Sequence, residues 1–205
     1  MIQNPVGYVP PVVRNLIILN IIMFVASQMM PQLYEWLSLF YPTSPFFKPV
    51  QIVSYMFMHG NLGHIFFNMF SLWMFGSIME NRWGPQRFLA FYFLCGLTAA
   101  AAHWGAMAYE LSQGHEEVLM IPTVGASGAT VGILGAFGMT FPETRLMLLI
   151  PPIPIKAKYF VVLFGAFELF TGMNGHQPGV AHFAHLGGLI TGVLIVLYWR
   201  RTGQA

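Results

Sequence analysis

Long apolar segments dominate this chain, and they restrict its possible folds more than any other feature. A helix needs roughly 20 mostly apolar residues to cross a bilayer. We therefore expect six membrane-spanning helices, at residues 12–30, 62–79, 88–109, 128–141, 157–171 and 180–199. The fourth and fifth are short for a hydrocarbon core of roughly 30 Å, so we expect surrounding protein to shelter their ends.

Composition supports the same class of protein. Only 8% of the residues are charged and 56% are apolar, whereas a soluble domain carries about 25% charged residues. We expect an all-α, polytopic membrane protein in which residues 1–205 form one domain without repeats. The net charge of +2 favours no nucleic-acid partner, and the single cysteine, Cys95, excludes an internal disulfide framework.

The basic residues predict the orientation of the spans. Cytoplasmic loops are enriched in lysine and arginine. If the spans alternate, eight of the nine basic residues fall on one side and only Lys48 falls on the other. Both termini are then cytoplasmic. The eight are Arg14, Arg82, Arg87, Arg145, Lys156, Lys158, Arg200 and Arg201.

Two segments near the start allow more than one interpretation. The first span could be a cleaved signal peptide, but its leading segment holds only Arg14 and no A-x-A site follows. Residues 31–50 carry patches of aromatic residues. This first loop is either partly inserted in the membrane interface or a plain linker with anchoring aromatics.

Polar residues inside apolar spans are costly, and each is a candidate functional residue. They form three clusters, which lie at the starts of the second, fourth and sixth spans. In the predicted topology all three starts face the outer side of the membrane, so the clusters lie at similar depth. The clusters are His59-Gly-Asn-Leu-Gly-His64-Ile-Phe-Phe-Asn68, Gly125-Ala-Ser127-Gly-Ala and His182-Phe-Ala-His185-Leu-Gly-Gly.

The fourth and sixth spans should pack closely, because both carry glycines four residues apart. Such packing would bring the hydroxyl of Ser127 near the imidazole of His185. A serine nucleophile needs an adjacent base, and a helix start offers N–H groups to a developing anion. Because the chain has no aspartate, the pair must act as a dyad or use another orienting group.

Each of these residues also has a plainer interpretation. A serine or asparagine in a span usually bonds its own backbone or a neighbouring helix. Four histidines at one depth could bind a metal, but no carboxylate lies beside them and no H-E-x-x-H motif is present. We therefore expect no metal and no cofactor. Glu168 is a buried-acid candidate that either reaches the interface or accepts a hydrogen bond from a histidine.

Taken together, the motifs resemble the rhomboid family of intramembrane serine proteases. The resemblance covers most of the chain from about residue 50 to residue 195. The matching residues are His59-Gly-Asn61-Leu-Gly-His64-x-x-x-Asn68, Gly125-x-Ser127-Gly and Ala184-His185-Leu-Gly-Gly188-x-x-x-Gly192.

The resemblance implies a serine endopeptidase that cleaves transmembrane-helix substrates near the outer face of the membrane. Ser127 would be the nucleophile and His185 the base. His64, Asn68 and the Ser127 N–H would form an oxyanion hole, with Gly125 shaping its approach and His59 supporting the entrance. The fifth span and the loop at 172–179 would gate substrate entry.

The chain departs from the family pattern at two places. Val131 occupies the position where many relatives have an aromatic residue that stacks on the histidine, so Phe183 or His182 is expected to orient His185 instead. The first loop lacks the Trp-Arg pair of many relatives, which leaves its detailed fold open.

The resemblance also implies a multi-pass protein of the bacterial inner membrane, with the lipid bilayer and membrane-protein substrates as its partners. Two rivals remain: a non-catalytic relative that binds membrane helices, and a transporter, for which no repeat between the halves is seen. The sequence leaves the oligomeric state and the natural substrate open.

Overall fold

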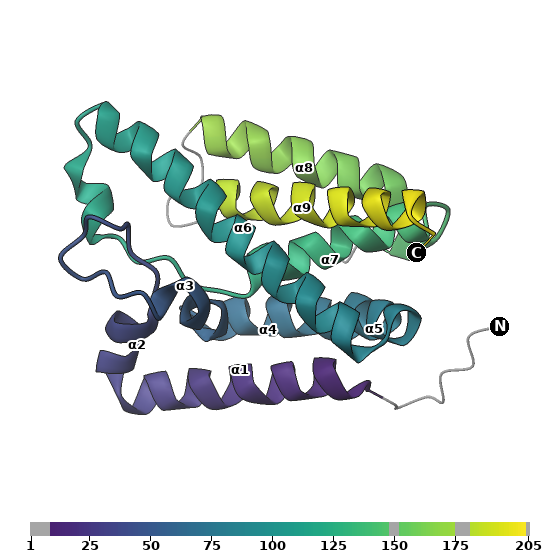
Figure 1. Cartoon of the computed structure of the whole chain (residues 1–205), viewed down its shortest axis with the longest axis horizontal. Coiled ribbons are helices and arrows are strands. Elements are labelled where there is room, and N and C mark those ends of the chain that lie inside the picture. Colours follow the sequence, from purple (N-terminus) through teal and green to yellow (C-terminus); the bar gives the residue numbers. More distant parts are fainter. Residues whose placement is uncertain (1–8, 148–151, 175–180, 204–205) are drawn as a thin grey trace.

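The computed structural model describes residues 9–147, 152–174 and 181–203, and these ranges form a bundle of helices (Figure 1). A two-stranded antiparallel hairpin connects α7 to α8. The elements are α1 (Pro11–Met29), α2 (Pro31–Leu37), α3 (Gln51–Ser54), η1 (Tyr55–Phe57), α4 (Leu62–Ser71), η2 (Leu72–Gly76), α5 (Ser77–Trp83), α6 (Pro85–Ser112), η3 (Glu116–Met120), α7 (Ser127–Thr140), β1 (Arg145–Met147), β2 (Pro154–Lys156), α8 (Ala157–Met173) and α9 (His182–Arg201).

The helices agree with the predicted spans. Four in the described ranges are long and apolar enough to cross a membrane: α1, α6, α9 and the continuous helix from Leu62 to Trp83 that comprises α4, η2 and α5. Helices α7 and α8 are shorter, with 14 and 17 residues. The predicted all-α, polytopic membrane fold is confirmed. The β1–β2 hairpin was not predicted.

The second span is longer than predicted, because the helix continues through Glu80, whose side chain is buried in the fold. The prediction ends this span at residue 79, where charged residues begin, but the helix continues to Trp83. The Glu80 carboxylate is buried and accepts hydrogen bonds from the N–H groups of Val12 and Val13, at 3.0 and 2.8 Å. A carboxylate at a helix N-terminus satisfies free N–H groups and the helix dipole. Glu80 therefore fastens α1 to α5.

Gln51 organises the first loop. Its side chain is fully buried, and its Oε1 accepts from the N–H groups of Phe40 and Lys48, at 3.4 and 3.1 Å. Its Nε2 donates to the carbonyls of Trp36 and Phe46, at 3.2 and 2.9 Å. One amide thus ties together a loop that lacks the Trp-Arg pair. Insertion of this loop into the membrane interface stays a prediction.

Helices α7 and α9 approach so closely that backbone meets backbone. A Cβ atom added to Gly188 would collide with the carbonyl of Gly128, and one added to Gly192 would collide with the carbonyl of Gly132. Only glycine fits at these crossings, and the small side chains let the helix axes come together. The contact lies in the interior of the bundle, with α6 packed against both helices.

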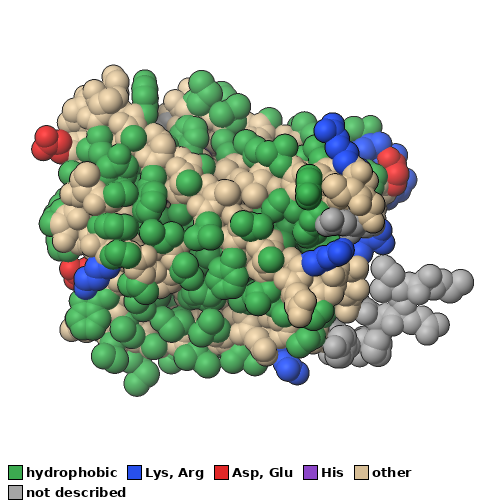
Figure 2. Space-filling model, in the orientation of Figure 1, with side chains coloured by type: hydrophobic (Ala, Val, Ile, Leu, Met, Phe, Trp, Pro, Cys, Tyr) green, Lys and Arg blue, Asp and Glu red, His purple; other side chains and the backbone are tan. Residues whose placement is uncertain are grey.

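Charge and apolar surface are separated along the bundle. Figure 2 shows Lys and Arg side chains gathered at the end where α1 begins and α9 ends, with an apolar surface between the two ends. At the basic end, Glu143 contacts both Lys156 and Lys158, and these lysines lower the pKa of the exposed Glu143 carboxyl to about 2. Apolar side chains facing outward include Ile22 and Val162, which are 56% and 68% exposed. This distribution suits a lipid-facing belt.

Replacing Gly188 by alanine should separate α7 from α9. The added methyl group collides with backbone that cannot rotate away, so we expect the free energy of unfolding to fall by about 2–3 kcal/mol. Thermal denaturation in detergent measures the loss. The matched control is Gly105→Ala in α6, where an added Cβ meets nothing within 4 Å. Equal stability of the two variants would contradict the close helix contact.

Candidate active site

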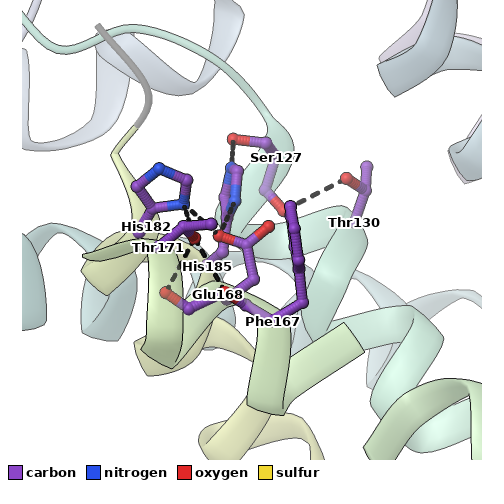
Figure 3. Close-up of polar contacts among 7 residues, drawn as sticks. All are labelled: Ser127, Thr130, Phe167, Glu168, Thr171, His182 and His185. Carbon is purple, nitrogen blue, oxygen red and sulfur yellow. Dashed lines mark hydrogen bonds and ion pairs between the residues drawn. The ribbon is translucent and has the colours of Figure 1, made fainter. Parts of the chain in front are cut away.

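Ser127 is the first residue of α7, and its hydroxyl faces α9. The N-cap position is Ala126, so no side chain caps the first turn. Ser127 Oγ lies 2.8 Å from Nε2 of His185, which belongs to the first turn of α9 (Figure 3). The close glycine contact between the two helices holds these side chains in register. A hydroxyl, an imidazole and the N–H groups of a helix start therefore meet at one point.

The other side of the His185 ring faces a buried carboxylate. Oε2 of Glu168, from α8, lies 3.0 Å from Nδ1 of His185 and 2.7 Å from Nδ1 of His182. The His182 contact is a hydrogen bond, whereas the His185 contact has ion-pair length without hydrogen-bond alignment. Oγ1 of Thr171 lies 3.1 Å from Nδ1 of His182. Figure 3 shows Glu168 between the two imidazoles.

His64 and Ser127 both lie beside Gly125. A Cβ atom at Gly125 would lie 2.7 Å from Nε2 of His64 and 3.6 Å from Oγ of Ser127. Gly125 also has a φ of +122°, a conformation that favours glycine. The N–H of Gly60 donates to Nδ1 of His64 at 3.4 Å. Because Nδ1 accepts, the ring proton of neutral His64 is on Nε2, the atom nearest to Gly125.

Asn68 lies one turn after His64 and is held by two contacts. Its Nδ2 donates to the carbonyl of His64 at 2.9 Å, and its Oδ1 accepts from the hydroxyl of Thr130 at 3.3 Å. These contacts determine which end of the amide is the donor. Since the NH₂ group carries two hydrogens, one N–H remains in addition to the bond to His64.

His59 packs edge-on against His64, with ring centroids 5.0 Å apart. It is fully buried, and neither ring nitrogen has a hydrogen-bond partner among the residues that the structure describes. Burial, together with the neighbouring His64, lowers the pKa of His59 to about 3, so the ring is neutral at physiological pH. Across the described ranges, no three His, Cys, Asp or Glu side chains are placed to share a metal ion.

Comparison with known proteins identifies the family. Residues 47–202, most of the chain, match the Rhomboid domain. This chain belongs to the rhomboid family. The match includes all three polar clusters, and the family assignment drawn from them is confirmed.

Curated relatives of this rhomboid come from bacteria and mitochondria. Rhomboid protease AarA of Providencia stuartii is 34% identical over 150 residues, covering 68% of this chain and 52% of the relative. Rhomboid protein 1, mitochondrial, of Saccharomyces cerevisiae is 28% identical over 150 residues, covering 73% and 41%. The human presenilin-associated rhomboid-like protein, mitochondrial, is 27% identical over 189 residues, covering 91% and 48%. The chain thus spans about half the length of the curated relatives it matches.

The structure of this rhomboid brings the predicted site residues together, and it adds others. Thr130 and Thr171 were not predicted, although both are polar residues in apolar helices and carry the signal that identified the rest. Of the two residues expected to orient His185, His182 shares the Glu168 carboxylate and Phe183 packs against Gly172. Residues 175–179, most of the loop at 172–179 that was expected to gate entry, lie outside the described residues. The catalytic and oxyanion assignments stay predictions.

Replacing Gly125 by alanine should displace the His64 ring. The new methyl group would lie 2.7 Å from Nε2 and 2.9 Å from Cε1 of that ring. We expect a loss of about 1–3 kcal/mol in unfolding free energy and shifted NMR signals from the His64 imidazole. Gly114→Ala is the matched control, because Gly114 also has a positive φ, +88°, with nothing within 4 Å. Unmoved His64 signals in Gly125→Ala would contradict the contact.

Proposed function

We propose that this rhomboid is an intramembrane serine endopeptidase with a Ser127–His185 dyad. The observation that carries the proposal is the 2.8 Å contact between Ser127 Oγ and His185 Nε2 at the start of α7. A serine hydroxyl is a weak nucleophile until a base takes its proton. A neutral imidazole whose Nε2 lone pair points at that hydroxyl is such a base.

In the first step, Oγ attacks the carbonyl carbon of the scissile peptide bond while Nε2 of His185 takes the hydroxyl proton. The carbonyl oxygen becomes an anion. The donors that we propose for this anion are the N–H of Ser127, Nε2–H of His64 and the second N–H of Asn68. Donors aimed at such an anion can lower the barrier by several kcal/mol.

In the second step, the C–N bond breaks and the imidazolium of His185 gives its proton to the leaving amine. An acyl group remains on Ser127. Water then attacks the acyl carbon with His185 again acting as base, and the carboxylate product leaves as Oγ is reprotonated. The hydrolysis needs no cofactor.

The proposed substrates are transmembrane helices that enter from the lipid and unwind near the outer face. A peptide bond inside a helix is shielded by its own hydrogen bonds, so cleavage requires a segment that opens easily. Small or helix-breaking residues provide such segments. The entrance, the gate and the single-domain organisation over residues 1–205 are parts of this proposal.

The proposed location is the bacterial inner membrane, with both termini in the cytoplasm. The basic end of the bundle would face the cytoplasm under the positive-inside rule. The site lies toward the opposite end, because α7 and α9 both start there and α9 ends among the arginines. The 34% sequence identity to rhomboid protease AarA of Providencia stuartii supports a bacterial membrane.

Removing either member of the dyad should abolish proteolysis. We expect Ser127→Ala and His185→Ala to leave a panel of labelled single-span membrane proteins intact in proteoliposomes that support cleavage by the wild type. A fluorophosphonate should label wild-type protein at Ser127 only. Cleavage by Ser127→Ala at the wild-type rate would refute the mechanism. A wild type that binds substrate helices without cutting them would support a non-catalytic helix-binding protein.

Asn68→Ala should lower turnover by about 10- to 1,000-fold, judged from other oxyanion donors, without abolishing it. The control is Asn20→Ala in α1. Asn20 is also buried and also donates from Nδ2 to the carbonyl four residues earlier, at 2.7 Å. It should lose stability but keep the wild-type rate per folded molecule. Equal rates for the two variants would remove Asn68 from the oxyanion hole.

A further inference from the structure

Glu168 is a buried acid on α8, and the exposed side chains around it on that helix are mostly apolar. Its side chain is only 6% exposed, while Val162 and Leu163 on the same helix are 68% and 59% exposed. An ionised group at such a position is costly unless it is paired. A carboxylate does not stabilise an isolated helix in lipid. The groups that Glu168 contacts therefore indicate its role.

Those partners are the two imidazoles of α9. Oε2 of Glu168 lies 3.0 Å from Nδ1 of His185, on the ring edge opposite the atom that contacts Ser127. A serine hydroxyl, an imidazole and a carboxylate therefore stand in a row. This is the order of groups in a serine triad, in a chain without aspartate.

The carboxylate can select the tautomer of His185. An ionised carboxylate only accepts hydrogen bonds, so a neutral imidazole beside it is stabilised with its proton on Nδ1. The lone pair of Nε2 then faces Oγ of Ser127, as a general base requires. After proton transfer from Oγ, the negative charge also stabilises the imidazolium, while the Nδ1 proton stays on the ring.

A second set of contacts holds the carboxylate in place. Nδ1 of His182 lies 2.7 Å from the same Oε2 and 3.1 Å from the hydroxyl of Thr171. That hydroxyl donates to the carbonyl of Phe167 at 2.8 Å. These contacts therefore fix the carboxylate relative to α9. A small rotation of the His185 ring would align its Nδ1–H with Oε2.

Val131 of α7 has no aromatic ring that could stack on the imidazole of His185, and its side chain is buried in the helix packing. A hydrogen bond along the ring edge restricts rotation of an imidazole as well as stacking on its face does. Glu168 would provide that restriction from α8.

We propose that Glu168 is a positioning residue that holds His185 in the Nδ1–H tautomer and aims its Nε2 at Ser127. This inference rests on the proposed function and deepens it. Glu168 acts through His185 and touches no reacting atom. The titratable groups that act on His185 in the described part of the chain are Glu168 and His182, together with His64 from α4 and His103 from α6.

Two variants of Glu168 separate positioning from packing. Glu168→Leu keeps the volume and removes both acceptor and charge, and Glu168→Gln keeps an acceptor oxygen without the charge. The measured quantity is the rate constant for fluorophosphonate labelling of Ser127, per folded molecule, with the folded fraction taken from thermal denaturation. We expect Glu168→Leu to lose about 10- to 1,000-fold and Glu168→Gln to lose less. For cleavage of a membrane substrate, kcat should fall while KM stays unchanged.

The control is Thr140→Val in α7, which removes a hydroxyl that donates to the carbonyl of Ala136 on the same helix, at 2.8 Å, and leaves the Glu168–His185 contact in place. We expect its labelling rate to stay within about twofold of the wild type. A loss as large as that of Glu168→Leu would show that any lost polar contact in the bundle slows labelling, and it would overturn the positioning role.

The ¹⁵N NMR shifts of the His185 ring give a readout that does not depend on activity. In the wild type, Nδ1 should carry the proton and Nε2 should be the unprotonated nitrogen, and Glu168→Leu should change this distribution. The same tautomer in wild type and Glu168→Leu would overturn the inference while leaving the Ser127–His185 dyad intact. Failure of the wild type to label at Ser127 would instead count against the proposed function, and the NMR result would still decide the role of Glu168.

Discussion

Gly188 and Gly192 of α9 lie against the carbonyls of Gly128 and Gly132 of α7, and the candidate site depends on this contact. Ser127 begins one helix and His185 lies in the first turn of the other. A wider spacing of the two helix axes would move Oγ and Nε2 out of hydrogen-bond range, because neither side chain is long. The packing of the α7 and α9 backbones therefore sets the distance between Oγ of Ser127 and Nε2 of His185.

Three buried side chains of this rhomboid follow one physical rule: a polar atom removed from water needs a partner. Glu80 satisfies the N–H groups that begin α1, and Gln51 satisfies four backbone groups of the first loop. Glu168 meets two imidazoles. In the first two cases the carboxylate or amide joins segments of the fold. In the third, the Glu168 carboxylate pairs with the proposed catalytic base, His185, so one side chain serves both the packing of the helices and the proposed chemistry.

The sequence predicts much of this architecture because membrane-spanning helices can be recognised as long runs of apolar residues. Apolar runs located all six helical segments, and glycines four residues apart indicated that α7 and α9 pack together. Side-chain partners were harder to predict. Glu168 could be named as a buried acid, but its contact with His185 depends on how α8 docks against α9, and no local pattern encodes that docking. The Gln51 side chain likewise contacts loop residues up to 15 positions away. The sequence around Gln51 has no pattern from which these contacts could be predicted.

The most direct test of the account is an experimental structure of the fluorophosphonate-treated protein in a lipid bilayer. We predict a bond between phosphorus and Oγ of Ser127, with Nε2 of His185 within hydrogen-bond distance and Oε2 of Glu168 on the far edge of the ring. Ser127 left unmodified beside a distant His185, with α7 and α9 separated at their glycines, would contradict the account.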